Sequence, residues 1–116
     1  MAGLAAIFGS GAMTNSVREI ENLEVILIVG SNTKETHPVI ANRMIKARRR
    51  GAKIIVVDPR RVPMVKFADL FLQLRPGTDN AILNGIAQVI LAEGLQNDAF
   101  IQEKTEGFEA WKESVR

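Results

Sequence analysis

Two short runs of aliphatic residues, each followed at once by a turn-forming residue, constrain the fold more than any other feature of this sequence. Residues 25–29 read Val-Ile-Leu-Ile-Val before Gly30, and residues 53–57 read Lys-Ile-Ile-Val-Val before Asp58. Runs of this length, rich in β-branched residues, are typical of strands in a sheet covered on both faces. We therefore predict buried strands at 24–29 and 53–57, and a third strand at 69–74.

Helical patterns separate and follow these strands. Ile40, Met44 and Ala47 share one face of a predicted helix over 38–50, which begins at Pro38 and ends at Gly51. Further helical segments are predicted at 15–23, 62–67, 79–93, 98–104 and 105–114. Alternation of strand and helix favours parallel crossovers. The prediction is a single α/β domain over residues 1–116, a three-layer, Rossmann-like fold with a short parallel sheet.

Composition excludes several classes of site. The 116 residues include no cysteine and one histidine, so the chain has no thiolate nucleophile, no cysteine ligand for an iron–sulfur cluster and no His/Cys zinc site. We predict no catalytic residue and no metal ligand. A net charge of +2 is too small to argue for nucleic acid. The apolar run at 25–29 is far shorter than the ~20 residues of a membrane span, and the start lacks a basic leader region, so we expect a cytoplasmic protein without a membrane segment.

The candidate binding residues follow the strands. Open parallel sheets bind ligands beyond the carboxyl ends of their strands, where residues 30–36, 58–62 and 75–79 are expected. In the first segment, Gly30 to Thr33 lets backbone N–H groups approach a phosphate, with a helix N-terminus behind them. The alternative is a plain turn in which Asn32 caps the helix.

The acidic residues of the other two segments also allow two interpretations. Asp58 either accepts hydrogen bonds from ribose hydroxyls or starts a turn before Pro59. Arg60 and Arg61 either pair with phosphates or are simply solvated. Asp79 either accepts two N–H donors from a guanine edge or is a first-turn acid that the helix dipole favours.

Two other functions compete with this interpretation. A nicotinamide dinucleotide-binding domain of a dehydrogenase would carry Gly-x-Gly-x-x-Gly after its first strand, and Gly30-Ser31-Asn32 does not supply it. A basic nucleic-acid-binding module would use residues 48–50, three consecutive arginines. Cations at the last turn of a helix are, however, favoured by the helix dipole without any ligand.

Several motifs, taken in order, resemble one family. They are GAMTN at 11–15, GSNTKETHP at 30–38, VDPRR at 57–61, LRPGTD at 74–79, ILNG at 82–85 and TEGFE at 105–109. Together they resemble the molybdopterin oxidoreductases of the dimethyl-sulfoxide-reductase superfamily, specifically formate dehydrogenase alpha subunits. The match runs from about Gly9 onward and corresponds to roughly one sixth of such a subunit.

The resemblance implies a role in holding bis-(molybdopterin guanine dinucleotide) with molybdenum or tungsten. The positions that it assigns to the dinucleotide are Gly30, Ser31, Asn32, Thr33, Glu35, Asp58, Pro59, Arg60, Gly77, Thr78 and Asp79. It implies that the whole subunit oxidises formate to CO2, with the catalytic cysteine or selenocysteine and the iron–sulfur cluster in regions that this sequence does not match. The implied partners are the remaining domains of the subunit and electron-transfer subunits, and these residues alone are expected to be inactive.

Overall fold

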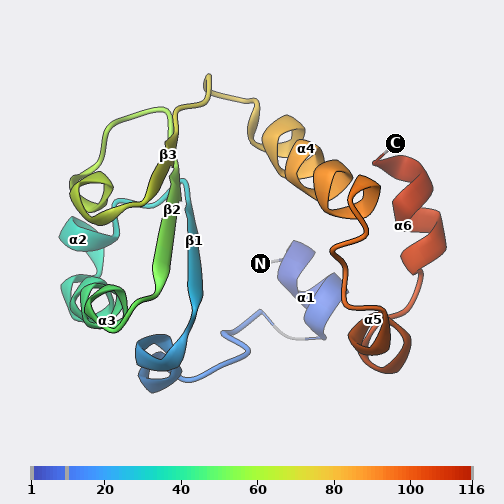
Figure 1. The fold of residues 1–116 in the computed structure, drawn as a ribbon, viewed down its shortest axis with the longest axis horizontal. Helices are drawn as coiled ribbons and strands as arrows, with labels where there is room; N and C mark the ends of the chain where they lie inside the picture. Colours follow the sequence, from blue (N-terminus) through green and yellow to red (C-terminus); the bar gives the residue numbers. More distant parts are fainter. Residues whose placement is uncertain (1, 10, 116) are drawn as a thin grey trace. The chain divides into compact units, whose positions relative to one another are not determined.

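The computed structural model describes residues 2–9 and 11–115. The chain forms two compact units, residues 1–73 and 74–116. The first unit contains a three-stranded sheet, and the second is helical (Figure 1).

The sheet of the first unit is entirely parallel. Its strands are β1 (Val25–Val29), β2 (Lys53–Val57) and β3 (Leu70–Leu72), in the order β1-β2-β3. Val29 lies opposite Val57, and Val57 lies opposite Leu72. The predicted α/β class with a short parallel sheet is therefore confirmed, and β3 is shorter than the predicted 69–74. All three strands end at the same edge of the sheet.

Helices cover one face of this sheet within the first unit. They are α2 (Thr33–Thr36), α3 (Pro38–Arg49) and the 3-10 helix η2 (Pro63–Phe67) (Figure 1). The core beneath them consists of buried apolar side chains, among them Ile26, Ile28, Ala41, Ala47, Ile54, Val56 and Met64.

The two faces of β1 differ in their exposure. Ile26 and Ile28 are buried, whereas Val25 is 57% exposed and Leu27 is 46% exposed. Successive side chains of a strand point to opposite faces, and only the face towards α2 and α3 is filled within this unit. The prediction that both faces of β1 are buried is therefore wrong for the first unit.

Local chemistry sets the ends of α3. Pro38 occupies its first position, where a missing N–H costs nothing, and Gly51 follows its end with a φ of +109°. Ala52 N–H donates to the Ala47 carbonyl at 3.1 Å, which closes the last turn. The predicted helix at 38–50 is thus confirmed to within one residue.

The amino-terminal segments depart further from prediction. The α-helix expected at 15–23 is a 3-10 helix, η1 (Val17–Asn22), and a helix not predicted from the sequence, α1 (Ala2–Phe8), precedes it. Ser16 N–H donates to Glu19 Oε1 at 3.0 Å, which closes the first turn of η1. Hydrogen bonds from Asn15 and Ser16 lower the pKa of Glu19.

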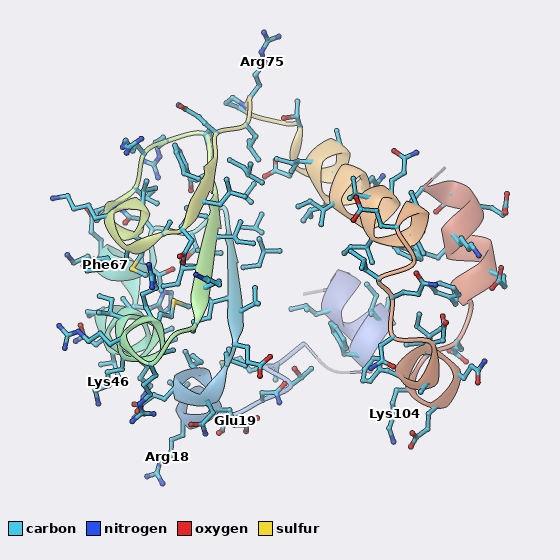
Figure 2. The ribbon with its side chains drawn as sticks, viewed as in Figure 1. Arg18, Glu19, Lys46, Phe67, Arg75 and Lys104 are labelled. Carbon is cyan, nitrogen blue, oxygen red and sulfur yellow. The ribbon has the colours of Figure 1, made fainter. Side chains whose placement is uncertain are left out.

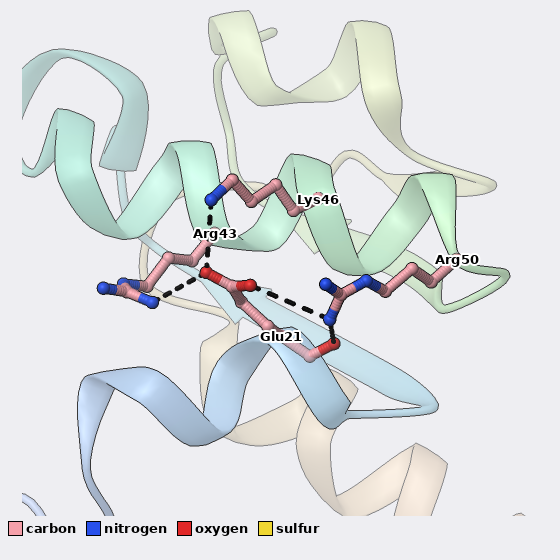
Figure 3. Close-up of polar contacts among 4 residues, drawn as sticks. All are labelled: Glu21, Arg43, Lys46 and Arg50. Atoms are coloured by element: carbon pink, nitrogen blue, oxygen red, sulfur yellow. Dashed lines mark hydrogen bonds and ion pairs between the residues drawn. The ribbon is translucent and has the colours of Figure 1, made fainter.

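Glu21 joins η1 to α3 (Figure 3). Its carboxylate lies 2.7 Å from Arg43 Nη1, 3.5 Å from Lys46 Nζ and 3.7 Å from Arg50 Nη1. Arg50 also donates to the Glu21 carbonyl at 3.4 Å. One carboxylate therefore holds two cations of α3, and Arg50 directly after it, against η1.

Asp69 plays a corresponding role where β3 begins. Its Oδ2 accepts a hydrogen bond from Ile54 N–H at 2.9 Å, and its Oδ1 lies 3.1 Å from Arg48 Nη2 and 3.5 Å from Lys53 Nζ. The bond from Ile54 is the main reason that the pKa of Asp69 is lowered, and the Arg48 and Lys53 charges add to it. This carboxylate ties α3, β2 and β3 together.

The second unit consists of α4 (Asp79–Ala92), α5 (Asp98–Lys104) and α6 (Phe108–Ser114). Gly94, with a φ of +65°, follows the end of α4, and the Asn97 side chain caps α5 by accepting from Phe100 N–H at 3.0 Å. The predicted helices at 79–93 and 98–104 are confirmed, and the last helix begins three residues later than predicted. Within the described part of the chain, no helix is long and apolar enough to cross a membrane.

Asp69 should make the free energy of unfolding depend on pH in the acidic range. A carboxyl whose folded pKa lies below its unfolded value stabilises the fold above the unfolded pKa, and this contribution disappears as the pH falls through the folded value. We expect Asp69→Asn to lower the free energy of unfolding at pH 7, and the difference from the parent chain to shrink only as the pH falls below the usual Asp pKa of about 3.9. Urea unfolding across this range measures the effect.

Glu24→Gln is the control for this experiment, because Glu24 is an exposed acid of the same unit. A constant difference between Asp69→Asn and the parent chain at all pH values would contradict the electrostatic role of Asp69.

Candidate functional site

The first two predicted segments lie side by side at the carboxyl edge of the sheet. Gly30 N–H donates to the Val57 carbonyl at 2.9 Å, so the loop after β1 starts against the end of β2. Further out, the Lys34 ammonium lies 5.3 Å from the centre of the Phe67 ring, which links α2 to η2. The structure therefore places the start of the 30–36 loop against the end of β2, where the 58–62 loop begins.

Gly30 gives the first loop its direction. Its φ is +58°, a conformation that side chains disfavour, and no atom lies within 4 Å of the place where a Cβ would be. The backbone therefore turns sharply after β1 and leaves space beside the turn. This arrangement suits the close approach of a ligand to main-chain N–H groups.

Polar side chains fill the rest of this loop. The Ser31 and Thr33 hydroxyls lie 2.9 Å apart, and Thr33 is only 5% exposed. Asn32 Nδ2 donates to Glu35 Oε2 at 2.6 Å, while Asn32 Oδ1 is buried without a partner among the described residues. Asn32 does start α2, through its backbone carbonyl rather than its side chain.

Asp58 shapes the second loop. It is 3% exposed, and its Oδ1 accepts a hydrogen bond from Arg60 N–H at 2.7 Å, an Asx-turn. Gln73 Nε2 donates to the Pro59 carbonyl at 3.0 Å, which ties the loop to the end of β3. Asp58 therefore forms the turn that one of the two interpretations of this residue predicts. Arg60 is exposed at the surface of the loop.

Gly77, Thr78 and Asp79 belong to the second unit. Thr78 N–H and Thr78 Oγ1 both reach the Arg75 carbonyl, at 3.1 and 2.7 Å, and Gly77 has a φ of +84°. Pro76 followed by a glycine at positive φ is the pattern of a type II turn. Thr78 occupies the N-cap position of α4 without a side-chain cap, and the half-buried Asp79 begins the helix.

Sequence reasoning left the role of Arg61 open. Its guanidinium carbon lies 5.6 Å from the centre of the Phe71 ring on β3. Arg61 and Phe71 are ten positions apart in the sequence, so no local spacing pattern indicates this contact. The pairing of β2 with β3 places Phe71 near the loop that follows β2. Across the described part of the chain, no group of three or more His, Cys, Asp and Glu side chains is placed to hold a metal ion.

Open parallel α/β sheets bind ligands outside the carboxyl ends of their strands. In this chain, that edge carries a glycine turn, paired hydroxyls and exposed basic residues. The family follows from comparison with known proteins. Residues 4–115 match the family model of the molybdopterin oxidoreductases, and the chain belongs to this family.

Individual relatives agree with this assignment. The chain is 52% identical over 114 residues to the F420-dependent formate dehydrogenase subunit alpha of Methanocaldococcus jannaschii, covering 98% of this chain and 17% of that protein. It is 42% identical to formate dehydrogenase H of Escherichia coli, covering 99% of this chain and 16% of that protein. The chain thus spans about one sixth of the length of these relatives.

A solved structure supports the fold. Acetylene hydratase from Pelobacter acetylenicus superposes with a TM-score of 0.70 and 32% identity, over 85% of this chain and 16% of that protein. The family and its fold are therefore established by sequence and by structure.

The paired hydroxyls of the first loop should be energetically coupled. Removing one partner leaves the other part-buried hydroxyl unsatisfied, whereas removing both is nearly neutral. We expect Ser31→Ala and Thr33→Val each to cost about 1 kcal/mol, and the double variant to cost clearly less than their sum. Urea unfolding of the four proteins gives the coupling energy. Strict additivity would mean that the two hydroxyls do not interact.

Proposed function

We propose that this chain binds the guanine dinucleotide part of a molybdopterin cofactor at the carboxyl edge of its sheet. The observation that carries the proposal is the juxtaposition of the loop at 30–36 with the loop at 58–62, in a chain that belongs to the molybdopterin oxidoreductases. In open α/β folds, the ends of neighbouring strands are where nucleotides bind.

The residues of the first loop suit such a ligand. Gly30 leaves the backbone open to approach. In the Ser31–Thr33 pair one hydroxyl donates to the other, so one O–H remains as a donor for a phosphate or sugar oxygen. Asn32 Oδ1 is a buried acceptor without a donor, a state that costs about 1–3 kcal/mol. A donor on the ligand would relieve this cost after a small movement of the loop. Glu35 fixes the Asn32 amide in place.

The second loop contributes shape and charge. Asp58 holds the Arg60 N–H in the turn, so that Pro59 and Arg60 form the surface that a ligand meets. Arg60 supplies a positive charge for the anionic part of the dinucleotide. In this proposal Asp58 acts through the conformation of the loop.

In the third segment, Asp79 distinguishes guanine from adenine. The turn through Gly77 and Thr78 presents Asp79 at the start of α4. A carboxylate accepts hydrogen bonds from both N1–H and the N2 amino group of guanine, and adenine offers no such pair. The helix dipole favours the ionised carboxylate at this position.

The bound cofactor would supply the two-electron redox chemistry through its molybdenum or tungsten, while this chain binds and orients the nucleotide. The similarity to formate dehydrogenase alpha subunits makes formate oxidation the proposed activity of the complete subunit, in the cytoplasm. The rest of that subunit and electron-transfer subunits are its proposed partners. This chain has no cysteine with which to ligate the metal.

Asp79→Asn tests the guanine-binding role. The substitution keeps the shape and turns one acceptor into a donor, so we expect GDP binding to weaken about ten- to a hundredfold and ADP binding to remain weak. Calorimetric titration of both nucleotides into parent and variant chains measures the effect.

The matched control is Asp98→Asn, since Asp98 is also a first-turn acid, on α5. Its GDP affinity should equal that of the parent chain. The guanine-binding role is contradicted if Asp79→Asn and the parent chain bind GDP equally well, or if the parent chain binds GDP and ADP equally well. Asp79 would then be only a first-turn acid of α4.

A further inference from the structure

Five cations of the first unit form ion pairs with two carboxylates. Arg43, Lys46 and Arg50 are paired with Glu21, and Arg48 and Lys53 are paired with Asp69. Both carboxylates lie towards the amino ends of the strands, because Glu21 precedes β1 and Asp69 precedes β3. These five charges are therefore compensated within the fold.

The carboxyl edge is different. Arg60 and Arg61 are exposed, and neither guanidinium has a carboxylate partner among the described residues. The Asp58 carboxylate beside them is buried, with one oxygen committed to the Arg60 backbone N–H. Uncompensated positive charge is thus left at the edge where a parallel sheet binds its ligands.

Of these two arginines, Arg61 has a defined position. Its guanidinium lies over the Phe71 ring, 5.6 Å from the ring centre, and Phe71 itself packs against the buried core. A cation–π contact of this kind restrains an otherwise mobile side chain. It requires no hydrogen-bond donor, so the N–H groups of the guanidinium stay available for an anion, and an arginine fixed in this way loses less entropy when it binds a phosphate.

We propose that Arg61, positioned by the Phe71 ring, binds the diphosphate of the dinucleotide. This inference rests on the function proposed above and adds a residue to it. Arg61 neutralises negative charge on the ligand with a planar set of donors that matches phosphate oxygens. Phe71 is a positioning residue, because it acts through Arg61.

The test compares GDP with guanosine, because only GDP carries the group that Arg61 would bind. We expect Arg61→Ala to weaken GDP binding about tenfold or more and to leave guanosine binding unchanged. Arg61→Lys should retain part of the affinity, since it keeps the charge without the planar donors. Phe71→Leu, which keeps the apolar bulk but removes the ring, should give a smaller loss, again for GDP alone.

Arg18→Ala is the matched control, since Arg18 is an exposed arginine on η1 and extends away from the sheet (Figure 2). It should bind GDP like the parent chain. The affinity for GDP should also fall less steeply with rising salt concentration in Arg61→Ala than in the parent chain.

The outcomes separate this inference from the proposed function. If the parent chain prefers GDP to ADP but Arg61→Ala binds GDP unchanged, or loses GDP and guanosine equally, the role of Arg61 is overturned and the guanine site stands. If Arg18→Ala loses as much GDP affinity as Arg61→Ala, the loss comes from the lower net positive charge of the chain and not from a contact of Arg61. The inference then also fails. If the parent chain does not bind GDP, both proposals fail.

Discussion

The parallel pairing of β1, β2 and β3 is the constraint on which the proposed site depends. Pairing in one direction makes all three strands end at one edge, and the bond from Gly30 N–H to the Val57 carbonyl joins the two loops that leave that edge. Two segments almost thirty residues apart in sequence become neighbours for this reason. An antiparallel partner for β1 would have placed the loop at 30–36 and the loop at 58–62 at opposite ends of the sheet.

Charge is distributed along the first unit in a way that fits this geometry. Glu21 and Asp69 gather five cations and fasten η1, α3, β2 and β3 to one another at the amino side. Ion pairs of this exposure are individually weak, and their value here lies in linking several elements at once. At the carboxyl side, the buried Asp58 carboxylate shapes a turn, and the two arginines after it have no carboxylate partner among the described residues.

Local chemistry made much of this predictable. Gly51 after α3, Pro38 at its start and the aliphatic runs of β1 and β2 specify their elements through short-range effects, and the sequence places them correctly. The 3-10 geometry of η1, the one-sided burial of β1 and the contact of Arg61 with Phe71 depend on residues distant in sequence. No periodicity carries that information. The candidate residues at 30–36 and 58–60 were found because strand ends are predictable, whereas their individual contacts required the fold.

The most direct test of the account is to map the binding surface residue by residue. Amide chemical shifts of the isotopically labelled 116-residue chain, recorded by NMR during titration with GDP, report where the nucleotide binds. The account predicts that the largest changes fall at 30–36, at Arg60 and Arg61, and at 77–79, with little change in η1 or at the amino ends of the strands. Changes centred on η1 and α3, near Glu21, or no change at saturating GDP, would contradict a nucleotide site at the carboxyl edge.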